Sequence, residues 1–196
     1  MNRVDGKQNR APRRDSDGRG LAFLLLLSTT VVSAQAPSLA PFVGTPTDVV
    51  ERMLTLAGTK PGDVVYDLGC GDGRIVIMAA RKFGARGVGV DIDPLLLMRA
   101  EADARAAGVA ERVTFRLQDA MTVDVSDANV VTLFLLAASN AKLRPILTSK
   151  LRPGARIVTH NYPLGGNWEP SVIDNFTDAG GMMRTLYLWV ADGRVH

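Results

Sequence analysis

Two patterns of hydrophobic positions alternate along the chain from residue 45 onward. Apolar residues that recur every three or four positions predict helices at 46–57, 74–83, 94–107 and 141–151. Short runs rich in apolar and β-branched residues predict strands at 64–68, 87–91, 113–117, 129–136 and 155–160. This alternation is typical of a parallel sheet covered by helices on both faces.

Residues at the ends of these elements support the assignment. Thr45 to Asp48 have the pattern of a capping box, with Pro46 at the first helical position. Pro145 falls near the start of the fourth helix, where its missing N–H is tolerated. A strand at 185–190 and a second one at 171–176 would close the sheet as an antiparallel edge hairpin. We therefore expect an α/β fold with a mostly parallel sheet.

Residues 1–36 follow a different pattern, which is that of a targeting segment. Residues 1–20 are polar and net positive, residues 21–32 are apolar, and 33–36 end in a small-x-small sequence typical of a signal-peptidase site. The apolar run is shorter than the roughly 20 residues of an ordinary transmembrane helix, although extension to Ala36 would make a short anchor. A signal peptide or membrane anchor at 1–36 and one domain at 37–196 are the expected organisation.

Three interpretations of this segment stay open, and each implies a different location. An uncleaved anchor would hold the domain at the membrane, facing the cytoplasm, through residues 21–36. A cleaved signal would export the domain. A start codon assigned too far upstream would leave a cytoplasmic protein. None of the three changes the fold expected for the rest of the chain.

Composition and charge narrow the class of protein. With 196 residues, 46% apolar content and one cysteine, the chain is neither a disulfide scaffold nor an intrinsically disordered protein. The net charge of +3 resides in residues 1–36, because the remaining 160 residues carry equal numbers of acidic and basic side chains. A neutral domain offers no electrostatic footprint for a phosphate backbone, so no nucleic-acid partner is expected.

Candidate chemistry is concentrated at the ends of the first three predicted strands. A glycine-rich stretch, Asp67 to Gly73, lies between a strand and a helix, where glycine lets a ligand approach the backbone closely. Asp91 ends the second strand, and Asp119 follows the third. A carboxylate at the end of a second strand can accept both hydroxyls of a ribose. The three loops therefore predict a nucleoside site at one edge of the sheet.

The glycine spacing decides which nucleoside fits. A dinucleotide fingerprint needs G-x-G-x-x-G, whereas here the third glycine is Gly73 and Arg74 follows it. The run Val65 to Gly73 instead resembles the first motif of class I S-adenosylmethionine (SAM) methyltransferases. Carboxylates near the loop suit this cofactor, because SAM carries an ammonium and a sulfonium group.

The resemblance extends to a narrower family. The chain resembles the small protein-lysine methyltransferases of the ATP synthase c-subunit and adenine nucleotide translocase type and their bacterial relatives. The resemblance is carried by residues 41–46, 67–77 and 87–91 and by Trp168. The similarity covers about residues 41–190. Two features depart from the family pattern: Gly44 stands where proline is usual, and residues 160–166 differ from the eukaryotic Arg-Phe-Pro pattern.

This resemblance implies a Rossmann-like fold, SAM as cofactor and a set of binding residues. Asp67 and the motif glycines would shape the pocket for the methionine end, Asp91 would hold the ribose, and Asp119 would meet the adenine amine. The implied cofactor-binding residues are Asp67, Gly69, Gly71, Asp72, Gly73, Asp91, Ile92, Asp119 and Ala120. No metal site is indicated.

The acceptor side is less specified, and the catalytic residues stay unnamed. Candidates for the acceptor pocket are Phe42, Thr45, Leu135, His160 and Trp168. His160 would be a base or acceptor-site residue, or else an ordinary loop histidine, and Trp168 would line the pocket or cover the sheet edge. Residues 133–136 lack the Asn-Pro-Pro-Tyr motif of amide and base-amine methyltransferases, which argues against that class. We expect Cys70 to be a small buried filler.

The sequence therefore predicts a SAM-dependent methyltransferase whose acceptor is a protein lysine. A lysine amine must lose a proton before it attacks a methyl group, and desolvation in a closed pocket would lower its pKa without a dedicated base. A small-molecule, lipid or quinone methyltransferase with the same cofactor site is an alternative. A non-catalytic, membrane-associated nucleoside-binding module is another.

Overall fold

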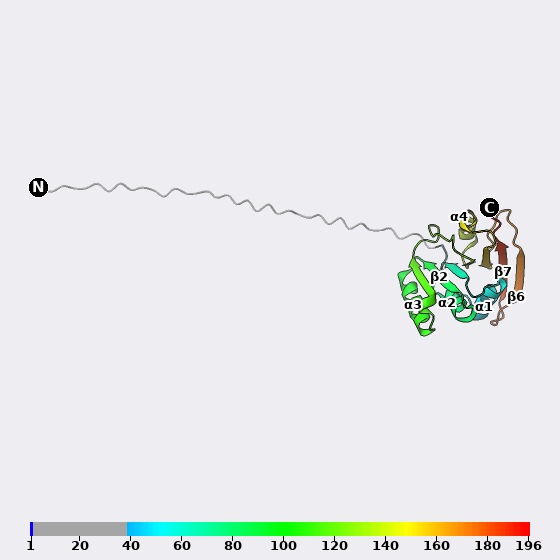
Figure 1. Cartoon of the computed structure of the whole chain (residues 1–196), viewed down its shortest axis with the longest axis horizontal. Helices are drawn as coiled ribbons and strands as arrows, with labels where there is room; N and C mark the ends of the chain where they lie inside the picture. Colours follow the sequence, from blue (N-terminus) through cyan, green and yellow to red (C-terminus); the bar gives the residue numbers. More distant parts are fainter. Residues whose placement is uncertain (2–38) are drawn as a thin grey trace. The chain divides into compact units, whose positions relative to one another are not determined.

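A computed structural model describes Met1 and residues 39–196 of the chain (Figure 1). The signal or anchor predicted at 1–36 and its boundary at residue 37 therefore lie, apart from Met1, outside the described residues. In the part of the chain that is described, no helix has the length and apolar character needed to cross a bilayer.

A seven-stranded sheet forms the centre of the domain, in the order β3-β2-β1-β4-β5-β7-β6. β1 to β5 run parallel, whereas β7 is antiparallel to both β5 and β6. The strands are β1 (Val64–Leu68), β2 (Arg86–Asp91), β3 (Val113–Leu117), β4 (Val130–Leu133), β5 (Arg156–His160), β6 (Val172–Thr177) and β7 (Met183–Val190). This arrangement confirms the predicted fold class, including the antiparallel edge hairpin.

Helices cover both faces of this sheet. They are α1 (Thr47–Leu56), α2 (Arg74–Phe83), α3 (Pro94–Ala106) and α4 (Ala137–Lys150), with a short 3₁₀ helix at Ala110–Arg112. α1 and α2 pack on one face around Val65, Val130 and Val158, and α3 lies beside α2 against β2 and β3. α4 covers the opposite face.

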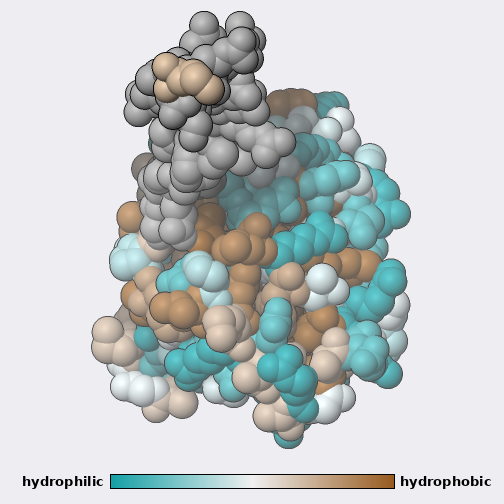
Figure 2. Space-filling view, turned by 90° about the vertical axis from the view of Figure 1, so that its left-hand side faces the viewer, coloured by the Kyte–Doolittle hydropathy of each residue, from teal (hydrophilic) through white to brown (hydrophobic). Residues whose placement is uncertain are grey.

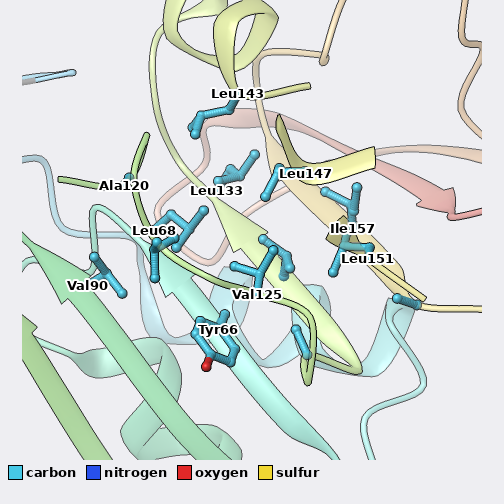
Figure 3. Packing of buried hydrophobic residues seen from close by; sticks show 14 of the residues in the cluster. Tyr66, Leu68, Val90, Ala120, Val125, Leu133, Leu143, Leu147, Leu151 and Ile157 are labelled. Carbon is cyan, nitrogen blue, oxygen red and sulfur yellow. The ribbon is translucent and has the colours of Figure 1, made fainter. Parts of the chain in front are cut away.

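The larger core cluster lies between the sheet and α4 (Figure 3). Leu68, Leu133 and Ile157 of the sheet meet Leu143 and Leu147 of α4, and all five are fully buried. Burial of one such side chain stabilises the fold by roughly 1.5–3 kcal/mol relative to an exposed one. The central strands are covered on both faces, which explains why their sequences are nearly continuous apolar runs.

The surface on the side of α3 and β3 is mixed in hydropathy (Figure 2). Hydrophobic and hydrophilic residues are interspersed there, and Leu95, Met98 and Leu117 are exposed.

Two predicted helix starts are wrong. α1 begins at Thr47 with Pro46 at its N-cap, and no side chain caps it. The carbonyl of Thr45 instead accepts a hydrogen bond from Arg74. α4 begins at Ala137, four residues before the predicted start, because the helix follows β4 closely. Pro145 is consequently in the interior of α4 and has no N–H to donate there.

Candidate active site

The turn between β1 and α2 is shaped by backbone contacts. The N–H groups of Gly69 and Cys70 both donate to the carbonyl of Val90, at 2.8 and 3.0 Å, which ties the turn to β2. Gly71 has a φ of +54°, and a Cβ on it would lie 2.4 Å from the ring of Phe42. The turn therefore needs glycine at 71 both for its left-handed backbone and for the ring packed on it.

Gly73 lies at the start of α2, where its neighbours leave no room for a side chain. Its φ is +74°, and a Cβ would lie within 3 Å of Phe115 and Ala100. Gly73 is the N-cap of α2, so its lack of a side chain lets α2 pack closely against α3 and β3. It does not line the cavity described below.

Asp91 connects the turn to the end of β2. One carboxylate oxygen accepts the N–H of Gly71 at 2.8 Å, and the other accepts the N–H of Asp93 at 3.0 Å. Each carboxylate oxygen has two lone pairs, so both keep capacity for a ligand hydroxyl. Asp119, at the end of the next strand, accepts the N–H of Met121 at 2.9 Å. Both carboxylates are therefore held in place by backbone N–H groups.

A cavity of about 490 Å³ opens along this edge of the sheet. Seven of the predicted cofactor residues line it: Asp67, Gly69, Asp72, Asp91, Ile92, Asp119 and Ala120. Gly71 does not line the cavity but packs against the ring of Phe42, which does. Three predicted acceptor residues, Phe42, Thr45 and Leu135, also line it. The structure thus brings most of both predicted sets to one site.

Asp67 is buried in the floor of the cavity. Its side chain accepts a hydrogen bond from the Thr132 hydroxyl at 2.8 Å, and only 3% of the residue is exposed. Burial, opposed by the Thr132 hydrogen bond, raises the pKa of Asp67 to about 7. Asp67 therefore changes charge near neutral pH, and a cationic ligand beside it would favour the carboxylate.

Asp72 and Arg74 form an ion pair beside the turn. The Arg74 Nε lies 2.8 Å from Asp72 Oδ1, and a second nitrogen of the same guanidinium bonds the other oxygen. Although burial opposes it, the Arg74 guanidinium holds the pKa of Asp72 below its usual value. The sequence analysis missed Arg74, although its place next to the glycine turn pointed to it.

Residues 39–45, which we term the roof segment, cross the cavity and are fastened at both ends. The Ser139 hydroxyl of α4 donates to the carbonyl of Leu39 at 2.6 Å. At the other end Arg74 Nη1 donates to the carbonyl of Thr45 at 2.8 Å. A Cβ on Gly44 would lie 2.5 Å from this guanidinium, so glycine at position 44 makes room for Arg74.

Two predicted acceptor residues do not line the cavity. His160 is fully buried at the end of β5, where its ring lies 4.0 Å from the ring of Phe134, centroid to centroid. Phe134, which the sequence analysis did not single out, does line the cavity.

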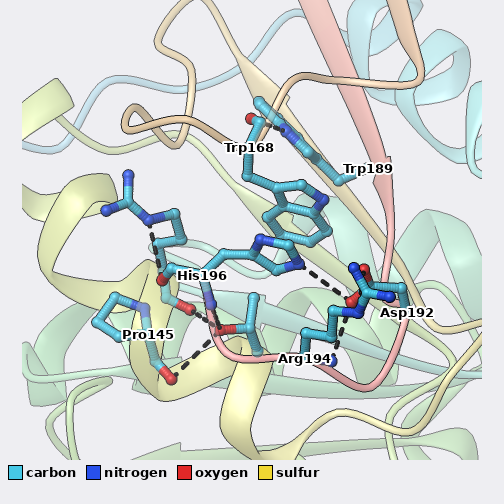
Figure 4. Close-up of polar contacts among 8 residues, drawn as sticks. Pro145, Trp168, Trp189, Asp192, Arg194 and His196 are labelled. Carbon is cyan, nitrogen blue, oxygen red and sulfur yellow. Dashed lines mark hydrogen bonds and ion pairs between the residues drawn. The ribbon is translucent and has the colours of Figure 1, made fainter.

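Trp168 stacks on His196 near the chain's C-terminus, with ring centroids 4.4 Å apart (Figure 4). Its carbonyl accepts the indole N–H of Trp189 at 2.9 Å. The indole of Trp168 packs against the core on the α4 face, so Trp168 covers the sheet.

Cys70 fills space beneath the turn. Its sulfur would lie 2.8 Å from a Cβ on Gly89 of β2, so the two residues are complementary in size. Burial, reinforced by the nearby carboxylates of Asp67 and Asp91, raises the pKa of the Cys70 thiol strongly. Among the described residues there is no cluster of three His, Cys, Asp or Glu side chains that would hold a metal ion.

Comparison with known proteins gives three findings. A sequence model of the ANTKMT methyltransferase domain matches residues 67–172. A protein-lysine N-methyltransferase from Saccharolobus islandicus is 43% identical over 76% of this chain and 92% of its own length. The adenine nucleotide translocase lysine N-methyltransferase of Mus musculus is 36% identical over 70% of this chain, which spans 60% of the mouse protein.

A solved structure is also similar. The RNA methyltransferase of Salinibacter ruber, in complex with S-adenosyl-L-homocysteine, superposes with a TM-score of 0.73. It is 49% identical in sequence, and the match covers 79% of this chain and 97% of that one.

Proposed function

The chain belongs to the ANTKMT methyltransferase family, and from that membership we propose that it N-methylates the side chains of protein lysines. It is a SAM-dependent methyltransferase with a Rossmann-like fold, as predicted from its sequence. The observation that carries the lysine proposal is the 43% identity to the S. islandicus protein-lysine N-methyltransferase across nearly all of that enzyme.

The residues around the cavity fit SAM. The missing side chains at Gly69 and Gly71 make room for Leu135 and Phe42, two residues that line the cavity. The cavity volume of about 490 Å³ lies within the range of small-molecule sites. Within the part of the chain that the structure describes, Asp67 accepts a hydrogen bond from Thr132 and forms no ion pair, which suits a ligand that carries an ammonium and a sulfonium. When bound, SAM supplies an electrophilic methyl group.

Three carboxylates would divide the recognition of this cofactor. Asp91 would accept the ribose hydroxyls with the lone pairs that Gly71 and Asp93 leave unused. Asp119 would accept from the adenine amine, and Asp67 would face the ammonium group. Because backbone N–H groups already orient Asp91 and Asp119, little reorganisation would be needed on binding.

Uncharged side chains form most of the acceptor end of the cavity, and the Arg74 guanidinium, which is paired with Asp72, lies beside them. Phe42 and Thr45 of the roof segment and Phe134 and Leu135 after β4 line it. A lysine side chain placed among these groups would be desolvated, which lowers the pKa of its amine from about 10.4 and favours the neutral, nucleophilic form. The chain would thereby orient the amine and exclude water.

RNA is a second candidate acceptor, because the S. ruber structure is that of an RNA methyltransferase. Against it, residues 37–196 carry as many acidic as basic side chains, and five aspartates line the cavity. A phosphate backbone would gain little from such a surface.

We also propose that residues 21–36 anchor the protein with its domain on the cytoplasmic side. SAM is a cytoplasmic metabolite, so this orientation provides the cofactor and leaves membrane proteins within reach as acceptors. A C-terminal reporter that is active only outside the cytoplasm should stay silent. An active reporter would contradict this orientation.

The test of the acceptor uses the full chain with methyl-labelled SAM. Membrane proteins, soluble proteins, total RNA and lipids of the native host are separate acceptor pools, and labelled protein is hydrolysed for methyl-lysine analysis. We expect label in methylated lysine with the wild-type protein and none with Asp91→Ala. Label confined to RNA, or to lipid and small molecules, would overturn the lysine proposal.

A further inference from the structure

His160 occupies a defined place at the carboxyl edge of the sheet. It ends β5 and is paired in the sheet with Leu186 of β7. Alternation along the strands puts its side chain on the same face of the sheet as Asp67 of β1 and Thr132 of β4. The register partner of Thr132 on β5 is Val158, so His160 lies on the same face two residues closer to the carboxyl end of the strand.

The imidazole of His160 is fully buried, yet neither ring nitrogen has a hydrogen-bond partner among the described residues. An unpartnered buried polar group destabilises the folded state. An aromatic hydrocarbon side chain would fill the same space without that cost. Two buried ring nitrogens therefore stand at a position where no hydrogen bond within the described residues accounts for them.

The backbone next to His160 is also constrained. Asn161 has a φ of +61°, the left-handed region that non-glycine residues seldom adopt. Two hydrogen bonds to Thr185 hold it there: the Asn161 N–H donates to the Thr185 carbonyl at 2.7 Å, and the Thr185 N–H donates to Asn161 Oδ1 at 3.2 Å. These contacts fix the backbone directly after His160.

His160 is uncharged at neutral pH. Burial, followed by the charge of Arg184 on β7, lowers its pKa to about 4, while Asp178 of the neighbouring turn opposes this. Arg184 and Asp178 pair with each other at 2.7 Å, so their net field at the imidazole is small. An uncharged imidazole has one N–H donor and one unprotonated nitrogen that can accept.

The ring of Phe134 connects His160 with the cavity. It lies 4.0 Å from the imidazole, centroid to centroid, and it lines the acceptor end of the cavity. The imidazole therefore lies one ring away from the place where the proposed function puts the acceptor.

We propose that His160 is an acceptor-positioning residue: when the Phe134 ring turns aside, the unprotonated ring nitrogen accepts a hydrogen bond from the acceptor's neutral amine through one bridging water molecule. The proposal rests on the proposed lysine acceptor. A neutral primary amine has two N–H donors and one lone pair. Holding an N–H turns the lone pair toward the methyl group, and the proton that the ammonium gives up goes to solvent.

Nitrogen NMR of the histidine rings tests this contact without requiring turnover. The full chain has two histidines, so selective labelling gives two imidazoles, and His196→Gln assigns them. The probe is n-butylamine, a lysine side-chain analogue, added at alkaline pH to protein saturated with S-adenosyl-L-homocysteine. We expect the unprotonated nitrogen of His160 to shift to lower frequency, whereas butyltrimethylammonium, which has no N–H, leaves it unchanged. No response to n-butylamine at its highest usable concentration overturns the proposal.

A matched substitution separates this role from a structural one. His160→Phe keeps a ring against Phe134 but removes both nitrogens. We expect a higher midpoint of thermal unfolding, an unchanged SAM dissociation constant, and methyl transfer to poly-L-lysine reduced about tenfold, the effect of losing one hydrogen bond. Partial recovery of transfer in His160→Asn supports the role of the nitrogen.

A structural histidine gives the reverse result, in which His160→Phe melts earlier and transfers methyl groups normally. The two proposals fail separately. If the wild type methylates no protein lysine, the proposed function fails, while the NMR response still reports on His160.

Discussion

The cofactor half and the acceptor half of this cavity are built in different ways. The cofactor half is made by backbone: a turn tied to β2, glycines with positive φ, and carboxylates that accept neighbouring N–H groups. Most of it comes from one stretch, residues 67–93. The acceptor half is made by side chains from the roof segment and from the two residues after β4, which are far apart in sequence. A substitution in the first half should act on SAM binding, and one in the second half on transfer.

The largest effect is expected from Asp91→Ala. The variant loses the acceptors for the ribose hydroxyls, and two charge-assisted hydrogen bonds correspond to at least about a hundredfold loss of SAM affinity. Calorimetric titration of the full chain with SAM, S-adenosyl-L-homocysteine and NAD measures it, and we expect the wild type to bind the first two only. Asp91→Asn keeps one oxygen for Gly71 or Asp93 and should fall between. Unchanged affinity in a folded Asp91→Ala would refute the ribose assignment.

A smaller effect on the same half is expected from Gly71→Ala. The new methyl group meets Phe42 at 2.4 Å, so it displaces the roof segment as well as straining the turn. We expect a loss of SAM affinity on the order of tenfold, which corresponds to about 1.4 kcal/mol. Gly58→Ala is the matched control, because Gly58 has a similar φ of +60° with nothing within 4 Å. Equal SAM affinity in the two variants would show that Phe42 does not contribute.

Asp67 gives the cofactor half a dependence on pH. Its pKa of about 7 means that the carboxyl must lose a proton before it faces an ammonium group. SAM affinity should therefore fall by up to about tenfold per pH unit below pH 7. Titrations between pH 8 and pH 6 measure this slope, and Asp67→Asn should abolish it. A wild-type affinity independent of pH would contradict the assignment of Asp67 to the ammonium.

The stability of the ligand-free protein should depend on pH in the opposite direction from SAM affinity. Because the folded pKa is raised from 3.8, folded Asp67 keeps a proton between about pH 4 and pH 7 that the unfolded chain has lost. The ligand-free protein therefore loses stability as the pH rises through this range. Thermal unfolding of Asp67→Asn should occur above that of the wild type at pH 8, and the gap should narrow toward about pH 5. If the difference in unfolding temperature between Asp67→Asn and the wild type grew toward acid pH, the pKa of Asp67 would be lowered by folding and not raised.

The smallest effect on chemistry is expected from Trp168→Phe. Trp168 stacks on His196 outside the cavity, so SAM affinity and transfer should both stay at wild-type values. The smaller ring should lower the midpoint of thermal unfolding, by an amount equivalent to about 1 kcal/mol. A selective loss of transfer would place Trp168 in the acceptor half after all.

The residues of the cofactor half could be predicted from the sequence more completely than those of the acceptor half. Strand ends marked by Asp67, Asp91 and Asp119 could be read locally, because parallel strands bring their carboxyl ends to one edge. Thr45 was read as a helix cap, but its carbonyl binds Arg74, a partner 29 residues away. His160 and Trp168 were assigned to one pocket because His160 ends β5 and Trp168 follows that strand. The structure separates them: His160 packs on Phe134, whereas Trp168 stacks on His196.

Cys70 makes the turn beneath the cofactor a reporter of its own local unfolding. The chain has one cysteine, and its thiol is buried and protonated, so a reagent can modify it only during transient opening of the turn. The modification rate at low reagent concentration then gives the free energy of that opening. Bound SAM should slow the reaction in proportion to its occupancy, which turns a single inert sulfur into a kinetic measure of how firmly the cofactor closes the site.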